Sequence, residues 1–131
     1  MAIRNTFKKY ERLKREQHID TLFRKGKAFS VSGLRFVYTL VPRGDDRSPV
    51  RAGFSVPKKK HKKSVTRHRL RRLMVEAWRQ NKAEVYKAIP EDMQLQLFVI
   101  FTSTEIADYN TVSTAMQAGM ARLVEQQSND A

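Results

Sequence analysis

The residues with the clearest chemical potential are the basic side chains between Arg47 and Val75. This segment contains 11 lysine and arginine residues and no carboxylate. The segment cannot neutralise its own charge, so it should lie against a polyanion. Arginine presents a planar fork of donors that suits phosphate groups. The chemistry that this segment predicts is therefore binding of a nucleic-acid backbone.

A helix expected over residues 65–79 would have two different faces. Apolar residues recur at helical spacing and form one stripe that should face a core: Leu70, Leu73, Met74, Ala77 and Trp78. Basic residues lie opposite that stripe or beside it: Arg67, His68, Arg69, Arg71, Arg72 and Arg79. A solvated helix face usually mixes both charge signs, whereas only Glu76 is acidic here. The pattern favours a phosphate-binding ladder over an ordinary solvated face.

A lysine-rich loop leads into this helix. Its cations are Lys58, Lys59, Lys60, Lys62 and Lys63, and Ser64 after them is a suitable N-cap. The positive end of the helix dipole should therefore lie beside these lysines. We expect an anionic backbone to prefer this corner of the molecule.

Catalytic residue patterns are scarce. The chain has no cysteine, and its three histidines, His18, His61 and His68, lack the companions of a metal site. There is no glycine-rich phosphate loop, nucleophile elbow or His-Glu-x-x-His motif. Binding is therefore a better prediction for this chain than catalysis by its own side chains, and we expect no metal site in it.

Four aromatic residues allow two interpretations. Phe36 and Tyr38 share one face of an expected strand, Phe54 can join them from the next strand, and Phe23 ends the first helix. Flat rings beside cations are surfaces on which unpaired bases stack. Aromatic residues in strands are more often core. Binding is favoured only if the sheet leaves one face uncovered.

Overall charge and length indicate the class of protein. The chain has 131 residues and a formal net charge of +13. Residues 1–89 carry a net charge of +18 and residues 90–131 one of −5, so the field is lopsided. Nucleic acid is the favoured partner, with an anionic membrane surface second. No apolar run is long enough to span a membrane, and we expect a cytoplasmic protein.

Hydrophobic periodicity predicts one α+β domain in the order α-β-β-β-α-α-β-α. Residues 1–14 are expected to be a basic arm that becomes ordered on a partner, residues 15–127 the domain, and residues 128–131 a tail. The helices expected before and after the sheet cover residues 15–25, ended by Gly26, and a last segment capped by Asp108. The expected strands are two within 28–41, interrupted at Ser32-Gly33, a third over 50–56 that forms a hairpin with the second, and an interior one over 94–101. A short helix over 82–88 should follow the basic one.

Three stretches resemble the protein subunit of bacterial ribonuclease P. They are Arg51-Ala-Gly-Phe-Ser-Val-Pro-Lys-Lys59, then Ser64-Val-Thr-Arg-His-Arg-Leu-Arg-Arg72, and Glu76-Ala-Trp-Arg79. The upstream Arg12-Leu-Lys-Arg15, with Phe23 and Gly26, also matches the opening of that family. The resemblance implies a fold like the second domain of ribosomal protein S5. That fold has a four-stranded sheet and a left-handed crossover through the basic helix.

The resemblance also implies a function and a set of site residues. The chain would be the small partner of a catalytic RNA that removes the 5′ leader of precursor tRNA. Magnesium would belong to the RNA, the protein alone would bind no cofactor, and neither DNA nor a membrane would be a partner. The charge pattern and the resemblance together give these expected RNA-binding residues: Arg12, Lys14, Arg15, Arg51, Lys58, Lys59, Lys60, Lys62, Lys63, Arg67, His68, Arg69, Arg71, Arg72 and Arg79. The implied leader-binding cleft, between the basic helix and the sheet, is lined by Ile19, Phe23, Phe36, Tyr38, Phe54, Ser55 and Arg67.

Three positions depart from the family pattern. His68 replaces a usual asparagine, Val75 a usual arginine, and Ile19 a frequent aromatic residue. Two other classes remain open on the residues alone. A ribosomal protein would share the basic face without needing an aromatic groove. A helix-turn-helix DNA binder would need two tightly joined helices, which a lysine-rich loop after a strand argues against.

Overall fold

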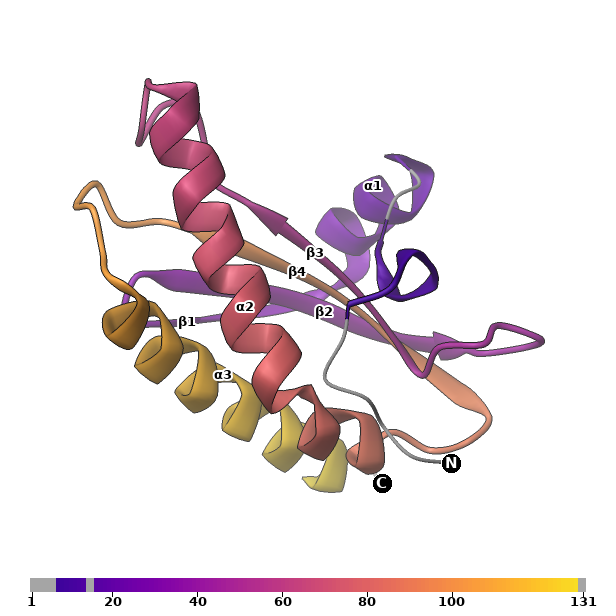
Figure 1. Cartoon of the computed structure of the whole chain (residues 1–131). Helices are drawn as coiled ribbons and strands as arrows, with labels where there is room; N and C mark the ends of the chain where they lie inside the picture. The colour runs from indigo at the N-terminus through magenta and orange to yellow at the C-terminus, as the bar shows by residue number, and fades with distance from the viewer. Residues whose placement is uncertain (1–6, 14–15, 130–131) are drawn as a thin grey trace.

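A four-stranded mixed sheet lies at the centre of the fold. The computed structural model describes residues 7–13 and 16–129. Its strands are β1 (Lys27–Val31), β2 (Leu34–Pro42), β3 (Val50–Ser55) and β4 (Met93–Phe101), in the spatial order β1-β2-β4-β3 (Figure 1). β2 is antiparallel to both β1 and β4, whereas β3 runs parallel to β4. The predicted α+β class and the interior position of the last strand are confirmed.

The turn between β1 and β2 is set by two residues of positive φ. Ser32 has φ 43° and Gly33 has φ 88°. Two consecutive positive φ values characterise the type I′ turn, whose twist matches that of the flanking strands. The predicted interruption at Ser32-Gly33 is therefore the turn of a two-residue hairpin.

The predicted hairpin between the second and third strands is wrong. β4 lies between β2 and β3, and its residues from Gln94 to Leu97 are buried. Such a strand needs a neighbour on each edge and cover on both faces. The connection over residues 43–49 therefore spans the width of β4 instead of closing a tight turn.

Three helices cover the two faces of this sheet unequally. α2 (Ser64–Ala88) and α3 (Tyr109–Asn129) lie together on one face, and the shorter α1 (Glu16–Lys25) lies on the other (Figure 1). The main core forms under α2 and α3, where Trp78 and Phe36 are fully buried. A smaller cluster of Leu13, Leu22 and Val37 forms under α1. We call the two sides the helix-covered face and the α1 face.

The two helices predicted over 65–79 and 82–88 form one continuous helix, α2. The Asn81 side chain donates to the carbonyl of Ala77 across the expected break. Lys82, at the expected start of the second helix, is buried and paired with Glu11. The helix also begins at Ser64, with Lys63 at the cap position and no side-chain cap bond, so Ser64 is not the N-cap.

The connection from β3 through α2 to β4 is a crossover between adjacent parallel strands. With α2 in front of the sheet and both strands pointing the same way, β4 lies on the left of β3 (Figure 1). The connection is therefore left-handed, as the resemblance implies, whereas nearly all such connections are right-handed.

The last helix forms as its pattern predicts. Asp108 accepts a hydrogen bond from the backbone N–H of Thr111 at 2.8 Å, which caps α3. Val112, Met116 and Met120 are buried on one stripe. Gly119 in the same stripe lets α3 approach the ring of Phe36, because a Cβ there would lie 2.1 Å from its Cζ.

The expected N-terminal arm is partly incorporated into the fold. Residues 9–11 form a short 3-10 turn, and Arg12 bridges to Ala52 at the edge of β3. The described residues 7–13 therefore pack on the domain. None of the helices in the described ranges is long and apolar enough to cross a membrane.

Replacing Gly119 with alanine tests the contact between α3 and the sheet. Alanine normally stabilises a helix relative to glycine by about 1 kcal/mol. Overpacking against Phe36 should outweigh that gain and lower the free energy of unfolding by about 1–3 kcal/mol. Urea denaturation measures the change, with the exposed Gln117→Ala as the control. A more stable Gly119→Ala variant would contradict this packing.

Candidate nucleic-acid interface

Exposed basic side chains gather at the start of α2 and in the loop before it. We call this set the basic surface: Lys58, Lys59, Lys60, Lys62, Lys63, His68, Arg69, Arg71 and Arg72. The opposite stripe of α2 is buried through Leu70, Met74 and Trp78. Helix periodicity therefore separates packing from charge as predicted, and the lysine loop adjoins the arginines.

Arg67, beside the basic surface, and Arg71, within it, also hold the backbone there. Arg67, which is half-buried, donates to the carbonyls of His61 at 3.0 Å and Lys62 at 2.7 Å. Arg71 donates through Nε to the carbonyl of Phe54 at 3.2 Å. Arg67 thus fixes the lysine loop on α2, and Arg71 fixes α2 against the end of β3. Part of this arginine ladder has a structural role as well as a positive charge.

His61 is a core residue. It is buried, its Nε2 lies 2.9 Å from the carbonyl of Ser103, and its ring packs on Phe101. A carbonyl oxygen only accepts hydrogen bonds, so Nε2 carries the hydrogen in this pair. His61 therefore anchors the lysine loop to the segment after β4.

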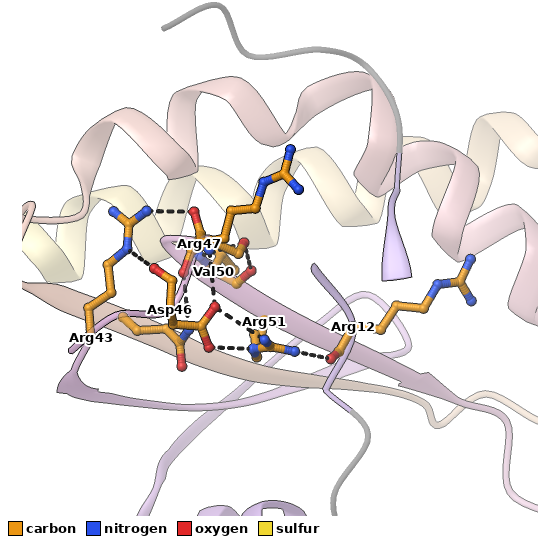
Figure 2. Close-up of polar contacts among 8 residues, drawn as sticks. Arg12, Arg43, Asp46, Arg47, Val50 and Arg51 are labelled. Carbon is orange, nitrogen blue, oxygen red and sulfur yellow. Dashed lines mark hydrogen bonds and ion pairs between the residues drawn. The ribbon is translucent and has the colours of Figure 1, made fainter. Parts of the chain in front are cut away.

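Arg51 is used inside the protein. Its guanidinium pairs with Asp46 at 2.7 Å and also donates to the carbonyl of Arg12 at 3.1 Å (Figure 2). Arg43 donates to the carbonyls of Asp46 and Arg47 in the same network. These contacts order the connection between β2 and β3. An RNA phosphate would therefore have to compete with the Asp46 carboxylate for the Arg51 guanidinium.

The network changes the titration of Asp46. Partial burial acts to raise its pKa, but hydrogen bonds from Arg51 and from the backbone N–H of Ser48 outweigh burial. The pKa of Asp46 is lowered to about 2. The carboxylate is therefore charged throughout the physiological range and neutralises part of Arg51.

The remaining predicted cations have mixed surroundings. Arg79 pairs with Glu76 one turn earlier on α2, and its hydrogen bond is the main cause of the lowered Glu76 pKa. The Arg12 guanidinium lies over the ring of Phe7, 4.7 Å from its centroid. Lys14 and Arg15 lie outside the described residues. The exposed cations of the basic surface are thus better placed for phosphate than Arg51 or Arg79.

The predicted groove between the basic helix and the sheet is filled by the core. Phe36, Tyr38 and Phe54 are 0%, 5% and 6% exposed. Phe36 stacks on Phe29, and Phe54 packs on the ring of Trp78. These three rings cannot stack on bases in this fold, so their assignment to a leader-binding cleft is wrong.

The α1 face carries the accessible aromatic surface instead. Phe23 is 47% exposed and meets the half-buried Phe98 ring edge-to-face, with 5.4 Å between the centroids. Ile19 packs against the same small cluster as Phe98, and Ser55 lies on this face at the end of β3. The predicted residues Phe23, Ile19 and Ser55 therefore share one side of the sheet, whereas Arg67 lies on α2.

Sequence reasoning missed Phe98, Ile100 and Arg35 on this face. Strand alternation could have found Arg35: if Phe36 faces the core, Arg35 must face the other side. Ile100 pairs with both Arg35 and Ser55 across the sheet. The position of the Phe98 ring could be found only from the folded structure. The ring lies over the backbone of Gly53, where a Cβ would be 2.8 Å from it.

A pocket of about 300 Å³ lies elsewhere, at the end of the sheet beside the start of α3. Leu34, Phe101, Ser103, Ile106 and Thr111 are among its lining residues. It contains none of the predicted site residues. Within residues 7–13 and 16–129, no group of three or more histidine or acidic side chains is arranged to hold a metal ion.

Neutralising Asp46 tests the role of the Arg51 network. The pKa of Asp46 in the folded state lies below its unfolded value of 3.8. The ionised carboxylate therefore adds to the free energy of unfolding above about pH 4, and this contribution is lost as the pH falls towards 2. Asp46→Asn should cost about 0.5–1 kcal/mol at pH 7, because the pair is partly exposed. Urea denaturation of both proteins between pH 6 and pH 2.5 should show this difference shrinking below pH 4. The control is Asp45→Asn, and a difference independent of pH would count against the ion pair.

Comparison with known proteins identifies the family of this chain. The family model for Ribonuclease P matches residues 7–124. The Ribonuclease P protein component of Porphyromonas gingivalis ATCC 33277 is 36% identical over 119 residues, covering 88% of this chain and 84% of that protein. The one from Chlorobium phaeobacteroides is 35% identical over 105 residues, covering 74% and 72%.

Solved structures share the fold. The Staphylococcus aureus RNase P protein superposes with a TM-score of 0.68 at 15% identity, over 87% of this chain and 97% of that one. The Thermotoga maritima RNase P protein gives a TM-score of 0.62 at 23% identity, over 86% and 96%. Since the family match spans the basic helix, the strands on both sides of it and most of α3, the chain belongs to the ribonuclease P protein family and acts in tRNA processing as the protein subunit of that enzyme.

Proposed function

We propose that this subunit binds RNA backbone through its basic surface and holds the single-stranded 5′ leader of precursor tRNA on its α1 face. The observation that carries the proposal is that the two surfaces meet at the carboxyl end of β3. Arg71 bonds to the carbonyl of Phe54 there, and the next residue, Ser55, lies on the α1 face beside Ile100. A strand of RNA leaving the basic surface would therefore reach Phe23 and Phe98 directly.

The basic surface suits the RNA subunit and the phosphates of the substrate. Its guanidinium groups are spaced by one helix, and binding to phosphates releases the counterions that the RNA had condensed. Val75, where the family usually has arginine, is half-buried and packs against the core. His68, where the family usually has asparagine, is exposed on the basic surface. This chain therefore lacks one phosphate contact of the family pattern and relies on the lysine loop and Arg69 to Arg72.

We assign cleavage of the phosphodiester bond to the RNA subunit. The residues near the basic surface do not fit a protein-bound magnesium ion, which prefers oxygen ligands. The described residues hold no group of three or more acidic or histidine side chains that could bind a metal ion, and Asp46 and Glu76 are already bound to arginines of this chain. Magnesium would instead be held by RNA phosphates, in a cytoplasmic ribonucleoprotein that has no DNA or membrane partner.

Removing two cations from the basic surface tests the backbone contact. Arg69 and Arg72 are exposed on α2, so the double variant Arg69→Gln and Arg72→Gln should keep its thermal midpoint. Each lost phosphate contact should flatten the slope of log affinity against log salt by roughly 0.7–0.9. Binding to the RNA subunit is measured at several salt concentrations between about 50 and 200 mM, where the affinity of such contacts changes steeply. The structural control is Arg67→Gln, which should lower the midpoint; an unchanged slope in the double variant would refute the contact.

Truncating the exposed ring of Phe23 tests leader binding. Stacking of a base on an aromatic side chain contributes about 1–3 kcal/mol, so Phe23→Ala should weaken holoenzyme binding of precursor tRNA by roughly tenfold. Mature tRNA, which has no leader, should bind as before. The matched control is Ile106→Ala, because Ile106 is an exposed apolar residue outside the α1 face. Equal losses of affinity for the two tRNAs would show that the α1 face does not bind the leader, and would leave the role of the basic surface unaffected.

A further inference from the structure

The segment before α1 is bound along the free edge of β3. The backbone N–H of Leu13 donates to the carbonyl of Ala52 at 3.0 Å, and Arg51 donates to the carbonyl of Arg12 (Figure 2). Phe7 packs edge-to-face on Phe54, with 5.7 Å between ring centroids. Residues 7–13 therefore act as an addition to the sheet edge, and the backbone of β3 has a partner there.

A buried ion pair anchors this segment to α2. Nζ of Lys82 lies 2.7 Å from Oε2 of Glu11, and the two side chains are 1% and 6% exposed. The same carboxylate oxygen accepts a hydrogen bond from the backbone N–H of Lys8 at 3.2 Å. Lys82 also lies over the ring of Tyr86, 5.0 Å from its centroid. Both charges are therefore satisfied, and removing either one would leave the other buried without its main partner.

Glu11 and Leu13 lie on opposite faces of the sheet. Glu11 points to α2 on the helix-covered face, whereas Leu13 is buried with Leu22 of α1 and with Val37. The segment thus passes around the edge of β3 within two residues. The carbonyl of Leu13 lies 3.5 Å from the position of a Cβ on Gly53, beside the Phe98 ring. Anchoring Glu11 on one face therefore fixes the residue against which α1 packs on the other.

We propose that the Glu11 and Lys82 pair is a positioning device, which holds α1 on the sheet and so keeps Phe23 and Phe98 together for the leader. The proposal rests on the proposed function of the α1 face. α1 is ten residues long, and isolated helices of that length are marginal in water. Its apolar contacts to the sheet come from Ile19, Leu22 and Phe23. A helix with so few anchors depends on the segment that leads into it.

The test uses Lys82→Met in the reconstituted holoenzyme. Without the ammonium group, the unpaired Glu11 carboxylate should leave its site, and α1 should open more often. Hydrogen exchange at the amides of α1 should accelerate by roughly tenfold or more, while exchange in α3 stays unchanged. Affinity for precursor tRNA should fall by roughly tenfold and affinity for mature tRNA should not.

A matched control and a rescue separate positioning from general stability. Lys87 on the same helix pairs with Glu84 at 3.8 Å on the surface, so Lys87→Met should change neither readout. The double variant Glu11→Leu and Lys82→Met replaces the pair with apolar side chains of similar size. It should recover the free energy of unfolding, while the protection of α1 and the preference for a leader stay reduced, because an apolar contact does not fix the register of the segment.

Two results would overturn the proposal. One is faster exchange that is spread evenly over α1, α2 and α3 in Lys82→Met, because the pair would then only stabilise the fold. The other is unchanged exchange in α1. A third outcome separates the two proposals. If α1 opens in Lys82→Met but Phe23→Ala changes the affinities for precursor and mature tRNA equally, the anchoring of α1 stands and the leader assignment fails.

Discussion

The parallel pairing of β3 with β4 is the constraint on which the rest of the structure depends. β4 is buried along most of its length and occupies an interior position, so β3 can join the sheet only at its far side. Two adjacent parallel strands must be connected by a crossover that returns the chain to the starting end of the sheet. Here that crossover is the 25-residue helix α2, preceded by the lysine loop. The position of the cations therefore follows from the way the sheet is completed.

The crossover also explains why charge and packing are separated so sharply. α2 must cover the sheet with one stripe, and the stripe from Leu70 to Tyr86 is buried against β3, β4 and α3. Its other side faces water, where the charged ends of arginine side chains stay hydrated and incur no desolvation penalty. The acidic residues of this chain that could neutralise nearby arginines are used at defined places, Asp46 on Arg51 and Glu76 on Arg79. The cations near the lysine loop keep their charge for an external polyanion.

The sequence alone predicts the features that depend on local pattern. The interior strand over 94–101, the cap at Asp108 and the cationic side of residues 65–79 follow from periodicity and were expected correctly. Two features could not be predicted because they depend on contacts between distant residues. The burial of Lys82 within one continuous helix depends on its pairing with Glu11, 71 residues earlier. Likewise, the partner of β3 depends on where β4 inserts. The assignment of Phe36, Tyr38 and Phe54 to a binding groove chose the wrong face, since alternation gives two faces but does not say which one the long helices cover.

The energetics of the buried pair support its assignment to positioning. Burying two charges costs several kcal/mol in desolvation, and well-packed apolar residues of similar volume often stabilise a fold as much or more. Stability alone therefore gives little reason for a lysine at a fully buried position of α2. An ion pair differs from an apolar contact in its direction, because only one placement of the carboxylate satisfies both Lys82 and the backbone of residue 8. An apolar contact would let the segment slide along the edge of β3. The ion pair fixes its register, and with it the point at which Leu13 crosses to the face that carries α1.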